Sequence, residues 1–536
     1  MKNLDHALKA IILVMLGIGA TTLLPAHNAS AAGTIQKSDY QQTSFSRIVD
    51  FYDYVRQYAT ENGITPPSTS EHAYLYTNYI NVQGFQLFYV GLVNATHNGR
   101  YVTIPMQTFF EHYNTPKGKD AITASSFLSL VAFNESTSGD PYPNSPDRTD
   151  TVYASFSLGV DMSTYTSGHP IPLVASSQVI PLTTTDNLHW TWGLKYTNLN
   201  AIWWKINPDP FYPSWDASTP RGIAQYNELT FQYDLTIDPI AKTAKLTASY
   251  TVGRVTDLWV LGQTPALHLN STGTYYGNGT RVNTQSVYSY LQQRQMKLSI
   301  VLANKTILAS EKTTDNAETG TSVDNDTSAD VSNTAIDTKA SDGEPVFKSD
   351  FGVKANYNLY DASDSNPTSV PAVTRTVGRL GWGGNPAFAF QGVLTGFLPL
   401  FVAHVAPELY NQAKSGLIDF SISNYLYIIS YPQWNGYKIV HDPDFTAFFQ
   451  PSQGTGLLTV IFIAIAAAAT VGGVVAFLLR KRRAGNIAFA SGPQTQNPVP
   501  PSPSSSPGPG LARRRRATPY FFSYLLLLRR EPSAKI

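Results

Sequence analysis

The histidines of this chain are the first residues to examine for metal or acid–base chemistry. Eight of the ten lie beyond residue 31: His72, His97, His112, His169, His189, His268, His404 and His441. None forms an HxH, HExxH or HxxxH pair, the spacings that let one element supply two ligands to a metal. Because the chain has no cysteine, Cys-ligated zinc, iron–sulfur clusters and thiol nucleophiles are excluded. We therefore predict no metal site and no catalytic residue.

Hydrolytic motifs are also absent from the sequence. There is no Gly-x-Ser-x-Gly elbow, and the glycines of residues 381–384 are not followed by the Lys-Ser/Thr of a phosphate loop. Paired carboxylates for glycoside hydrolysis are brought together by the fold and have no fixed spacing in sequence. A surface hydrolase therefore stays open as an alternative function.

A haem b site is a further alternative. Extracellular β-sandwich domains related to DOMON cytochromes hold haem between Met and His or Lys ligands. Beyond residue 31 the only methionines are Met106, Met162 and Met296, and no motif surrounds them. We predict no cofactor, and keep an extracellular solute-binding or haem-binding electron-transfer module as the alternative.

Five of the eight tryptophans fall within 26 residues: Trp190, Trp192, Trp203, Trp204 and Trp215. If these side chains were exposed, they would form a platform on which sugars or a partner protein could stack. If they were buried, they would be the core of one sheet. The sequence favours the core and leaves the ligand platform open.

Six Asn-x-Ser/Thr sequons are candidate glycosylation sites, because this motif accepts N-linked glycans in exported proteins. They are Asn94, Asn134, Asn270, Asn278, Asn304 and Asn325. Asn270 and Asn278 lie close together in a segment rich in Gly, Thr and Tyr, which favours an exposed loop.

The elements that would position these residues are mainly strands. Aromatic and β-branched runs at 85–94 and 100–110 flank His97-Asn98-Gly99, which predicts a hairpin. Apolar and polar residues alternate over 231–237 and again over 246–252, which predicts strands with one buried and one wet face. The spacing at 46–58 predicts a short amphipathic helix. The predicted fold class is mainly β, with a β-sandwich-like ectodomain, a few helices and one C-terminal transmembrane helix.

Composition divides the predicted ectodomain. Residues 32–311 form its β-rich first part, and residues 345–450 continue it with an apolar helix at 388–414. Residues 312–344 are rich in Ser, Thr and Asp and have almost no large apolar side chain, which predicts a disordered insertion. Within residues 388–414, the almost continuously apolar stretch 393–405 is interrupted by Gly396 and Pro399 and is too short to cross a membrane. We therefore expect a buried helix at 388–414, with a membrane-inserting segment as the alternative.

Two apolar segments enclose this ectodomain. Residues 1–31 have the basic start, the apolar core and the Ala29-Ser30-Ala31 site of a signal peptide. Residues 456–479 carry no charge and at 1.5 Å per residue reach about 36 Å, enough to cross a membrane. The basic residues Arg480, Lys481, Arg482 and Arg483 follow, so residues 480–536, with a Pro/Ser-rich stretch, are expected to be a cytosolic tail.

Charge is distributed unevenly along the chain. The net charge is +1 overall, but outside the signal and the tail 25 basic and 35 acidic residues remain, a net of about −10. Nucleic-acid binding needs a basic surface, so an acidic exterior argues against it. The expected partners are the membrane, through residues 456–479, and surface glycans or envelope proteins.

Residues 436–445 read Gly-Tyr-Lys-Ile-Val-His-Asp-Pro-Asp-Phe. This segment resembles the membrane-proximal end of uncharacterised archaeal-type membrane-anchored surface proteins. The resemblance implies a signal peptide, a Cys-free β-rich ectodomain and a C-terminal anchor, and it supplies no activity and no functional residue. We expect a non-enzymatic, single-pass cell-surface glycoprotein at the cell membrane, whose ectodomain serves binding or envelope structure.

Overall fold

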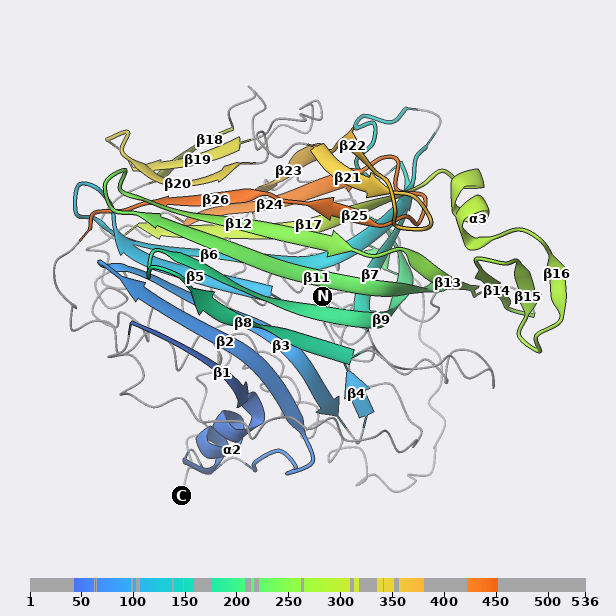
Figure 1. The fold of residues 1–536 in the computed structure, drawn as a ribbon, viewed down its shortest axis with the longest axis horizontal. Helices are drawn as coiled ribbons and strands as arrows, with labels where there is room; N and C mark the ends of the chain where they lie inside the picture. Colours follow the sequence, from blue (N-terminus) through green and yellow to red (C-terminus); the bar gives the residue numbers. More distant parts are fainter. Residues whose placement is uncertain are drawn as a thin grey trace, which may run out of the picture. The chain divides into compact units, whose positions relative to one another are not determined.

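The chain is mainly β, as its sequence predicts (Figure 1). The computed structural model describes residues 43–451, with gaps at 62, 64, 98–99, 103–106, 137–138, 148, 159–175, 208–213, 216–220, 262–264, 309–312, 318–334, 341, 351–355 and 380–421. Within these residues there are 26 strands and the two helices α2 (Phe51–Glu61) and α3 (Val287–Gln293).

Eight antiparallel strands form a continuous run, called here the first sheet. In order across the sheet they are β1 (Ser44–Asp50), β2 (His72–Val82), β3 (Phe85–His97), β5 (Gln107–Asn114), β6 (Asp120–Asn134), β17 (Met296–Leu308), β24 (Ile422–Tyr431) and β23 (Val373–Arg379). Strands from both ends of the described chain therefore lie in one sheet, with the early strands β1 to β6 on one side and the later strands β17, β24 and β23 on the other. The hairpin predicted around residues 97–99 is confirmed, since His97 pairs with Arg100 of β4 (Arg100–Val102).

A second antiparallel run, the second sheet, begins with the order β8 (Ser176–Thr184), β9 (His189–Asn207), β11 (Gly222–Asp238) and β12 (Thr243–Val252). The far edge of β12 pairs with two short strands, β26 (Asp444–Phe448) and β25 (Ile439–His441). From β26 the run continues through β20 (Pro345–Asp350), β19 (Ala335–Ala340) and β18 (Thr313–Ala317), and from β25 through β21 (Asn356–Tyr360) and β22 (Pro367–Pro371).

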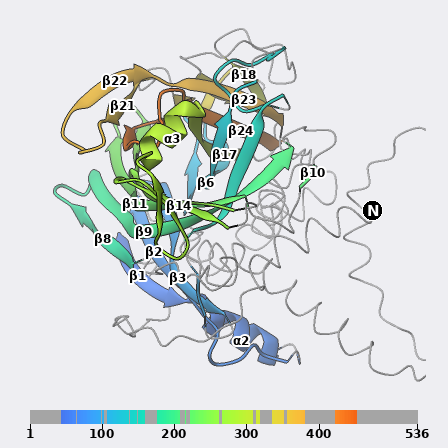
Figure 2. The ribbon, with the colours of Figure 1, turned by 90° about the vertical axis from the view of Figure 1, so that its right-hand side faces the viewer.

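The two sheets are joined along one side by β7 (Thr151–Leu158), which pairs with β6 of the first sheet and β9 of the second. The short strand β10 (Ser214–Trp215) also pairs with β9. A small meander pairs with the first residues of β11 and leads into α3 (Figure 1, with β14 and α3 also labelled in Figure 2). Its strands are β13 (Val255–Val260), β14 (Leu267–Asn270), β15 (Thr274–Tyr276) and β16 (Arg281–Asn283).

Aromatic rings from the two sheets meet and form the core between them. The ring centroids of Phe127 on β6 and Phe231 on β11 are 4.7 Å apart, and those of Phe109 on β5 and Phe445 on β26 are 5.4 Å apart. Tyr89 on β3 lies 5.2 Å from Tyr233 on β11. Edge-on and tilted ring pairs of this kind stabilise a core beyond the area that they bury. In a chain without cysteine, these contacts hold the sheets together.

The predicted alternation of buried and wet residues is confirmed in β11 and β12. Phe231 pairs with Tyr250 and Leu235 with Leu246, and these side chains are buried, whereas Gln232 and Asp234 between them are exposed. The first sheet differs, because its other face is also apolar. Phe88, Val90 and Phe110 alternate with the core residues of β3 and β5 and are at most 5% exposed.

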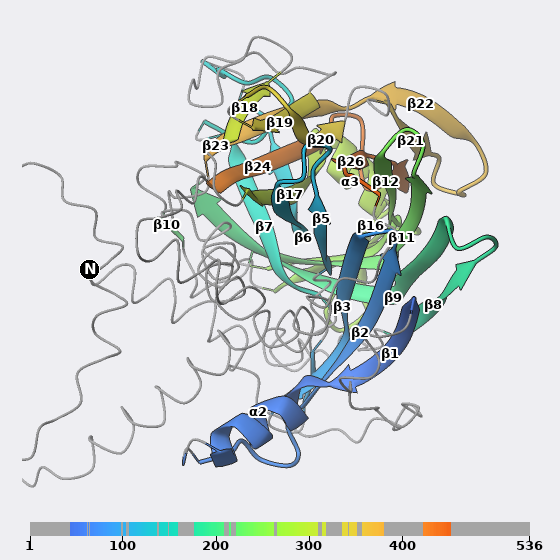
Figure 3. The same ribbon diagram turned by 90° about the vertical axis from the view of Figure 1, so that its left-hand side faces the viewer.

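The helix predicted at 46–58 begins later than expected (Figure 3). Residues 44–50 form β1, which pairs along its whole length with β2, and α2 starts at Phe51. The Oδ1 atom of Asp50 accepts hydrogen bonds from the backbone N–H groups of Tyr52 and Ala73. The buried Asp50 carboxylate thus caps the helix and ties it to β2, a tertiary contact that helical spacing does not reveal.

Several predicted segments lie wholly or partly outside the described residues. These are residues 1–31, 388–414, 456–479 and 480–536, and within the described part of the chain no helix is long and apolar enough to cross a membrane. Residues 312–344 are predicted to be a disordered insertion, but segments near both ends of this range form strands. Thr313–Ala317 and Ala335–Ala340 pair with each other, and the second of these strands also pairs with β20.

Candidate functional site

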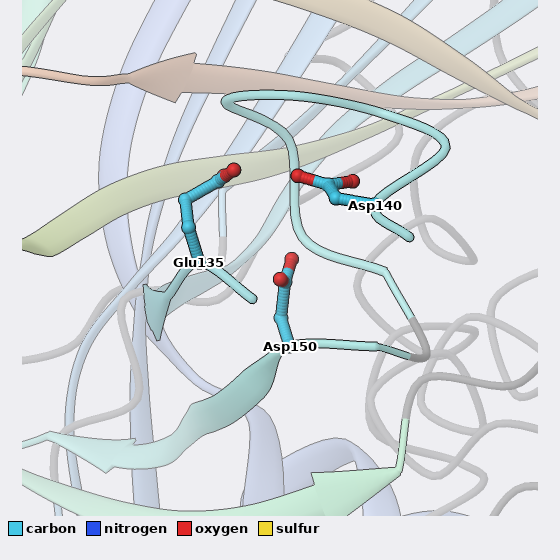
Figure 4. Close-up of side chains that lie close together, drawn as sticks. All are labelled: Glu135, Asp140 and Asp150. Carbon is cyan, nitrogen blue, oxygen red and sulfur yellow. The ribbon is translucent and has the colours of Figure 1, made fainter. Parts of the chain in front are cut away.

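Three carboxyl groups converge where β6 passes into β7 (Figure 4). One carboxylate oxygen from each of Glu135, Asp140 and Asp150 lies within 4.8 Å of the other two. Sheet register explains the meeting of two of them. Asn134 at the end of β6 pairs with Thr151 at the start of β7, so the next residue on each side, Glu135 and Asp150, must also be neighbours. We call these three residues the carboxyl site.

The loop between β6 and β7 is built around the same carboxyl groups. Asp150 accepts hydrogen bonds from the backbone N–H of Ser136 (2.8 Å) and of Asp147 (3.0 Å). Asp140 accepts one from the backbone N–H of Tyr142 at 2.8 Å. Backbone donors favour the ionised form of a carboxyl, so these bonds both shape the loop and hold negative charge in it.

Two cations from the first sheet contact this loop. The ammonium group of Lys297 on β17 lies 3.3 Å from Glu135 Oε1 and donates a hydrogen bond to Asn144 Oδ1 at 2.7 Å. Arg375 on β23 donates to the carbonyl oxygen of Pro146 at 2.7 Å, and its guanidinium lies 4.1 Å from the centre of the Tyr142 ring. Sheet residues distant in sequence therefore fix the position of the loop.

Burial dominates the electrostatics of the site. It raises the pKa of Glu135, helped by a hydrogen bond with Asp140 and opposed by the charge of Lys297. Burial also raises the pKa of Asp150 to about 6, against the two backbone donors. A carboxyl group whose pKa is raised toward neutrality can take up and give back a proton in the physiological pH range, as a general acid or base does.

A divalent cation is the other species that this arrangement could hold. Ca²⁺ prefers carboxylate and carbonyl oxygens at about 2.4 Å, which puts two ligands of one ion at most about 4.8 Å apart, and the three carboxyl groups meet that limit. The ammonium of Lys297 beside Glu135 already supplies positive charge. A cation would therefore have to displace a proton and compete with Lys297.

Four of the five clustered tryptophans are buried, as the sequence favours, and do not form the open platform that is the alternative. Trp190, Trp192, Trp203 and Trp204 lie on β9 and are at most 5% exposed. Trp192 stacks on Tyr233 at 5.4 Å, and Trp203 stacks on Tyr153 at 5.8 Å. Trp190, Trp192 and Trp203 pack into the main hydrophobic core, and Trp204, whose side chain points to the opposite face of β9, is also buried. The side chain of Trp215 lies outside the described part.

The structure separates the sequons by their surroundings. Asn278 is exposed, and Asn94, Asn134 and Asn270 are partly exposed. Asn134 donates a hydrogen bond from its amide to the carbonyl oxygen of Arg294. Asn304 is only 1% exposed, and its amide donates to Ser125 Oγ at 2.8 Å between β17 and β6. A glycan cannot be accommodated on Asn304 in this fold. Asn325 lies outside the described residues.

The carboxyl site was missed from sequence because its members are joined by strand register and not by motif spacing. One signal could have pointed to it. The sequence between β6 and β7 is dense in Asp, Asn and Pro, with Asp140, Asn144, Asp147 and Asp150 in eleven residues. Of the methionines considered for haem, Met296 is 3% exposed, and Met106 and Met162 lie outside the described residues.

Comparison with known proteins gives no relative from which a role for these residues could be transferred. The chain matches no known protein family and no curated protein.

Proposed function

We propose that this protein is a single-pass cell-surface protein that presents a glycosylated β-sandwich module outside the cell, for binding or for envelope structure. The facing of the first and second sheets supports the β-sandwich. Residues 456–479 and the basic residues 480–483 after them support a membrane anchor with a cytosolic tail. The resemblance of residues 436–445 to archaeal-type surface proteins agrees with this location.

One observation carries the proposal, namely the position of two sequons in turns of the meander. Asn278 is exposed between β15 and β16, and Asn270 is partly exposed at the end of β14. In both, Oδ1 accepts a hydrogen bond from the backbone N–H of the Thr two residues on, at 3.0 Å for Thr280 and 2.8 Å for Thr272. In these Asx turns the hydrogen bonds use the Oδ1 atoms, whereas a glycan would attach to the Nδ2 atoms.

Protease treatment of intact cells tests the location. The β-rich region should be cut from outside, while a tag placed after residue 536 should stay protected until the cells are opened. Mass analysis of the released fragment should show glycan on Asn278, lost in Asn278→Gln. Protection of the β-rich region in intact cells, with cleavage after lysis, would contradict the proposal.

A surface hydrolase is the second candidate, and the carboxyl site is the observation that favours it. Its oxygens lie within 4.8 Å of one another, nearer to the separation of about 5–5.5 Å in retaining glycosidases than to that of inverting ones. Purified full-length protein should then cleave surface polysaccharide, with loss of activity in Glu135→Gln and Asp150→Asn. Asp186→Asn, at an exposed carboxyl on another loop, is the matched control, and equal activity in all variants would exclude this role.

A further inference from the structure

Glu111 is a carboxyl group in the middle of the protein. Its side chain is 0% exposed. Among the residues that the structure describes, neither of its two carboxyl oxygens has a hydrogen-bond partner. Buried carboxyl groups are normally paired or hydrogen-bonded, so this one requires an explanation of its own.

The position of Glu111 on β5 places it between the two sheets. Phe109 and Tyr113, two residues before and after it, both face the second sheet. The Phe109 ring contacts Phe445 of β26 at 5.4 Å, and Tyr113 Oη donates to the carbonyl oxygen of Val346 on β20 at 2.8 Å. Because alternate residues of a strand share a face, Glu111 points into the same space.

The neighbours of Glu111 are apolar or hydroxylic. On the first sheet it lies opposite Leu87 of β3 and Thr123 of β6, and Thr123 Oγ1 lies 3.4 Å from both Tyr113 Oη and Thr306 Oγ1. From the second sheet, β20 and β26 bring Phe347, Ser349, Phe445 and Ala447, all at most 2% exposed.

Among the described residues, no positively charged side chain acts on the carboxyl group of Glu111. The nearest titratable side chain on the same face is Tyr113, whose own pKa is raised by burial and by the charge of Glu111. His112, the next residue, lies on the opposite face of β5, where its Nε2 pairs with Asp120 Oδ1 at 2.6 Å. An ionised Glu111 would therefore be a bare charge between two apolar layers, which is strongly unfavourable.

We propose that Glu111 is a proton-dependent lock between the two sheets: the side chain is neutral while they are in contact and ionises when they separate, so its contribution to the stability of the ectodomain is largest in acid. Burial raises the pKa of Glu111 to about 8, whereas an unfolded Glu titrates near ~4.3. Between these values the folded state holds one more proton than the unfolded state. Stability is therefore full below about pH 4, falls as pH rises, and levels off above about pH 8.

The measurable effect is a change in the unfolding equilibrium constant. For one such group that constant rises about tenfold per pH unit inside the window. Urea unfolding of the full-length protein in detergent micelles, followed by fluorescence of the buried tryptophans, gives this slope at pH 5, 6, 7 and 8. Between pH 5 and 7.5, the unfolding equilibrium constant of the wild type should rise with each pH unit by about ten times the factor by which that of Glu111→Gln rises.

Two controls keep this test decisive. Glu135 also has a raised pKa, so Glu135→Gln measures its share, and Glu111→Met serves if Glu111→Gln does not fold. A wild-type slope retained in the Glu111 variant would overturn the proposal. Infrared spectra give a direct check that needs no Glu111 variant: folded Glu135→Gln protein should keep a protonated-carboxyl band at pH 7, and its absence would show that Glu111 is ionised and the proposal wrong.

Discussion

The ammonium group of Lys297 lies 3.3 Å from Glu135 Oε1, and this contact connects the centre of the first sheet to the loop of the carboxyl site. Lys297 stands on β17 opposite Phe133 of β6, two residues before Glu135. The same ammonium holds Asn144 on the far side of the loop. One side chain thus holds the start and the middle of the loop, and its charge opposes the rise in the pKa of Glu135 that burial causes.

Replacing Lys297 by Met should destabilise the protein by about 1–3 kcal/mol, because a partly buried charge-assisted hydrogen bond and its ion pair are lost. The free energy of unfolding from urea titration at pH 7 measures this change. Lys339→Met is the matched control, since Lys339 is more exposed and lies 3.9 Å from Asp337, and should cost less than about 1 kcal/mol. Equal effects of the two substitutions would contradict a special role for Lys297.

Asp150 should make stability fall as pH rises from about 4 to about 6. Its folded pKa is raised to about 6, above the ~3.9 of an unfolded Asp, so the folded state binds more protons within this window and loses that advantage above it. Asp150→Asn should reduce the pH dependence of the urea midpoint between pH 4 and 6, leaving the share of Glu111 and Glu135. Asp186, whose pKa is lowered to about 2 by hydrogen bonds from His189 and the backbone, should give the opposite trend between about pH 2 and about pH 4. An unchanged profile in Asp150→Asn would refute the assignment.

Gly193 should tolerate no side chain. It lies on β9 opposite Gln232 of β11, and a Cβ atom there would overlap the carbonyl oxygen of Phe231. We expect Gly193→Ala to cost about 1–3 kcal/mol, as overpacking does, measured by thermal unfolding. Gly222 is the control in the same pair of strands, because a Cβ there would sit at ordinary contact distances of 3.4 Å and more. A melting temperature lowered as much by Gly222→Ala as by Gly193→Ala would disprove this explanation.

Glycan mapping should distinguish the sequons by burial. If the protein is exported, peptides containing Asn278 should carry glycan, and peptides containing Asn304 should not, because the Asn304 amide is buried against Ser125. Asn304→Gln should lower stability by about 1–3 kcal/mol through the lost hydrogen bond without changing glycan mass. Full glycan occupancy at Asn304 in folded protein would contradict the burial of the Asn304 side chain between β17 and β6.

The strands of the second sheet could be predicted well, and the roles of single side chains could not. Period-two alternation identified both partners in the pairing of Phe231 with Tyr250, because a half-buried strand leaves that pattern in sequence. Burial of Trp192 and Asn304 depends on which sheet lies opposite, and pairing of β6 with β17, about 160 residues further along the chain, has no local signal. Glu111 likewise occurs in an ordinary-looking strand, and only the second sheet turns it into a buried acid.

The pairing of early strands with late ones in the first sheet has a consequence for folding during synthesis of the chain. In the first sheet β17 lies between β6 and β24, so the edge of β6 stays without its partner until residues beyond 300 have been synthesised, and the sheet is complete only when β24 is available. Strands so far apart in sequence pair slowly, and until they pair their unpaired edges are prone to aggregation. A chain with this topology cannot fold to its final form behind the ribosome one segment at a time. If it is exported, it must cross the membrane unfolded and assemble its core on the far side, where a chaperone that covers the open edge of β6 would raise the yield.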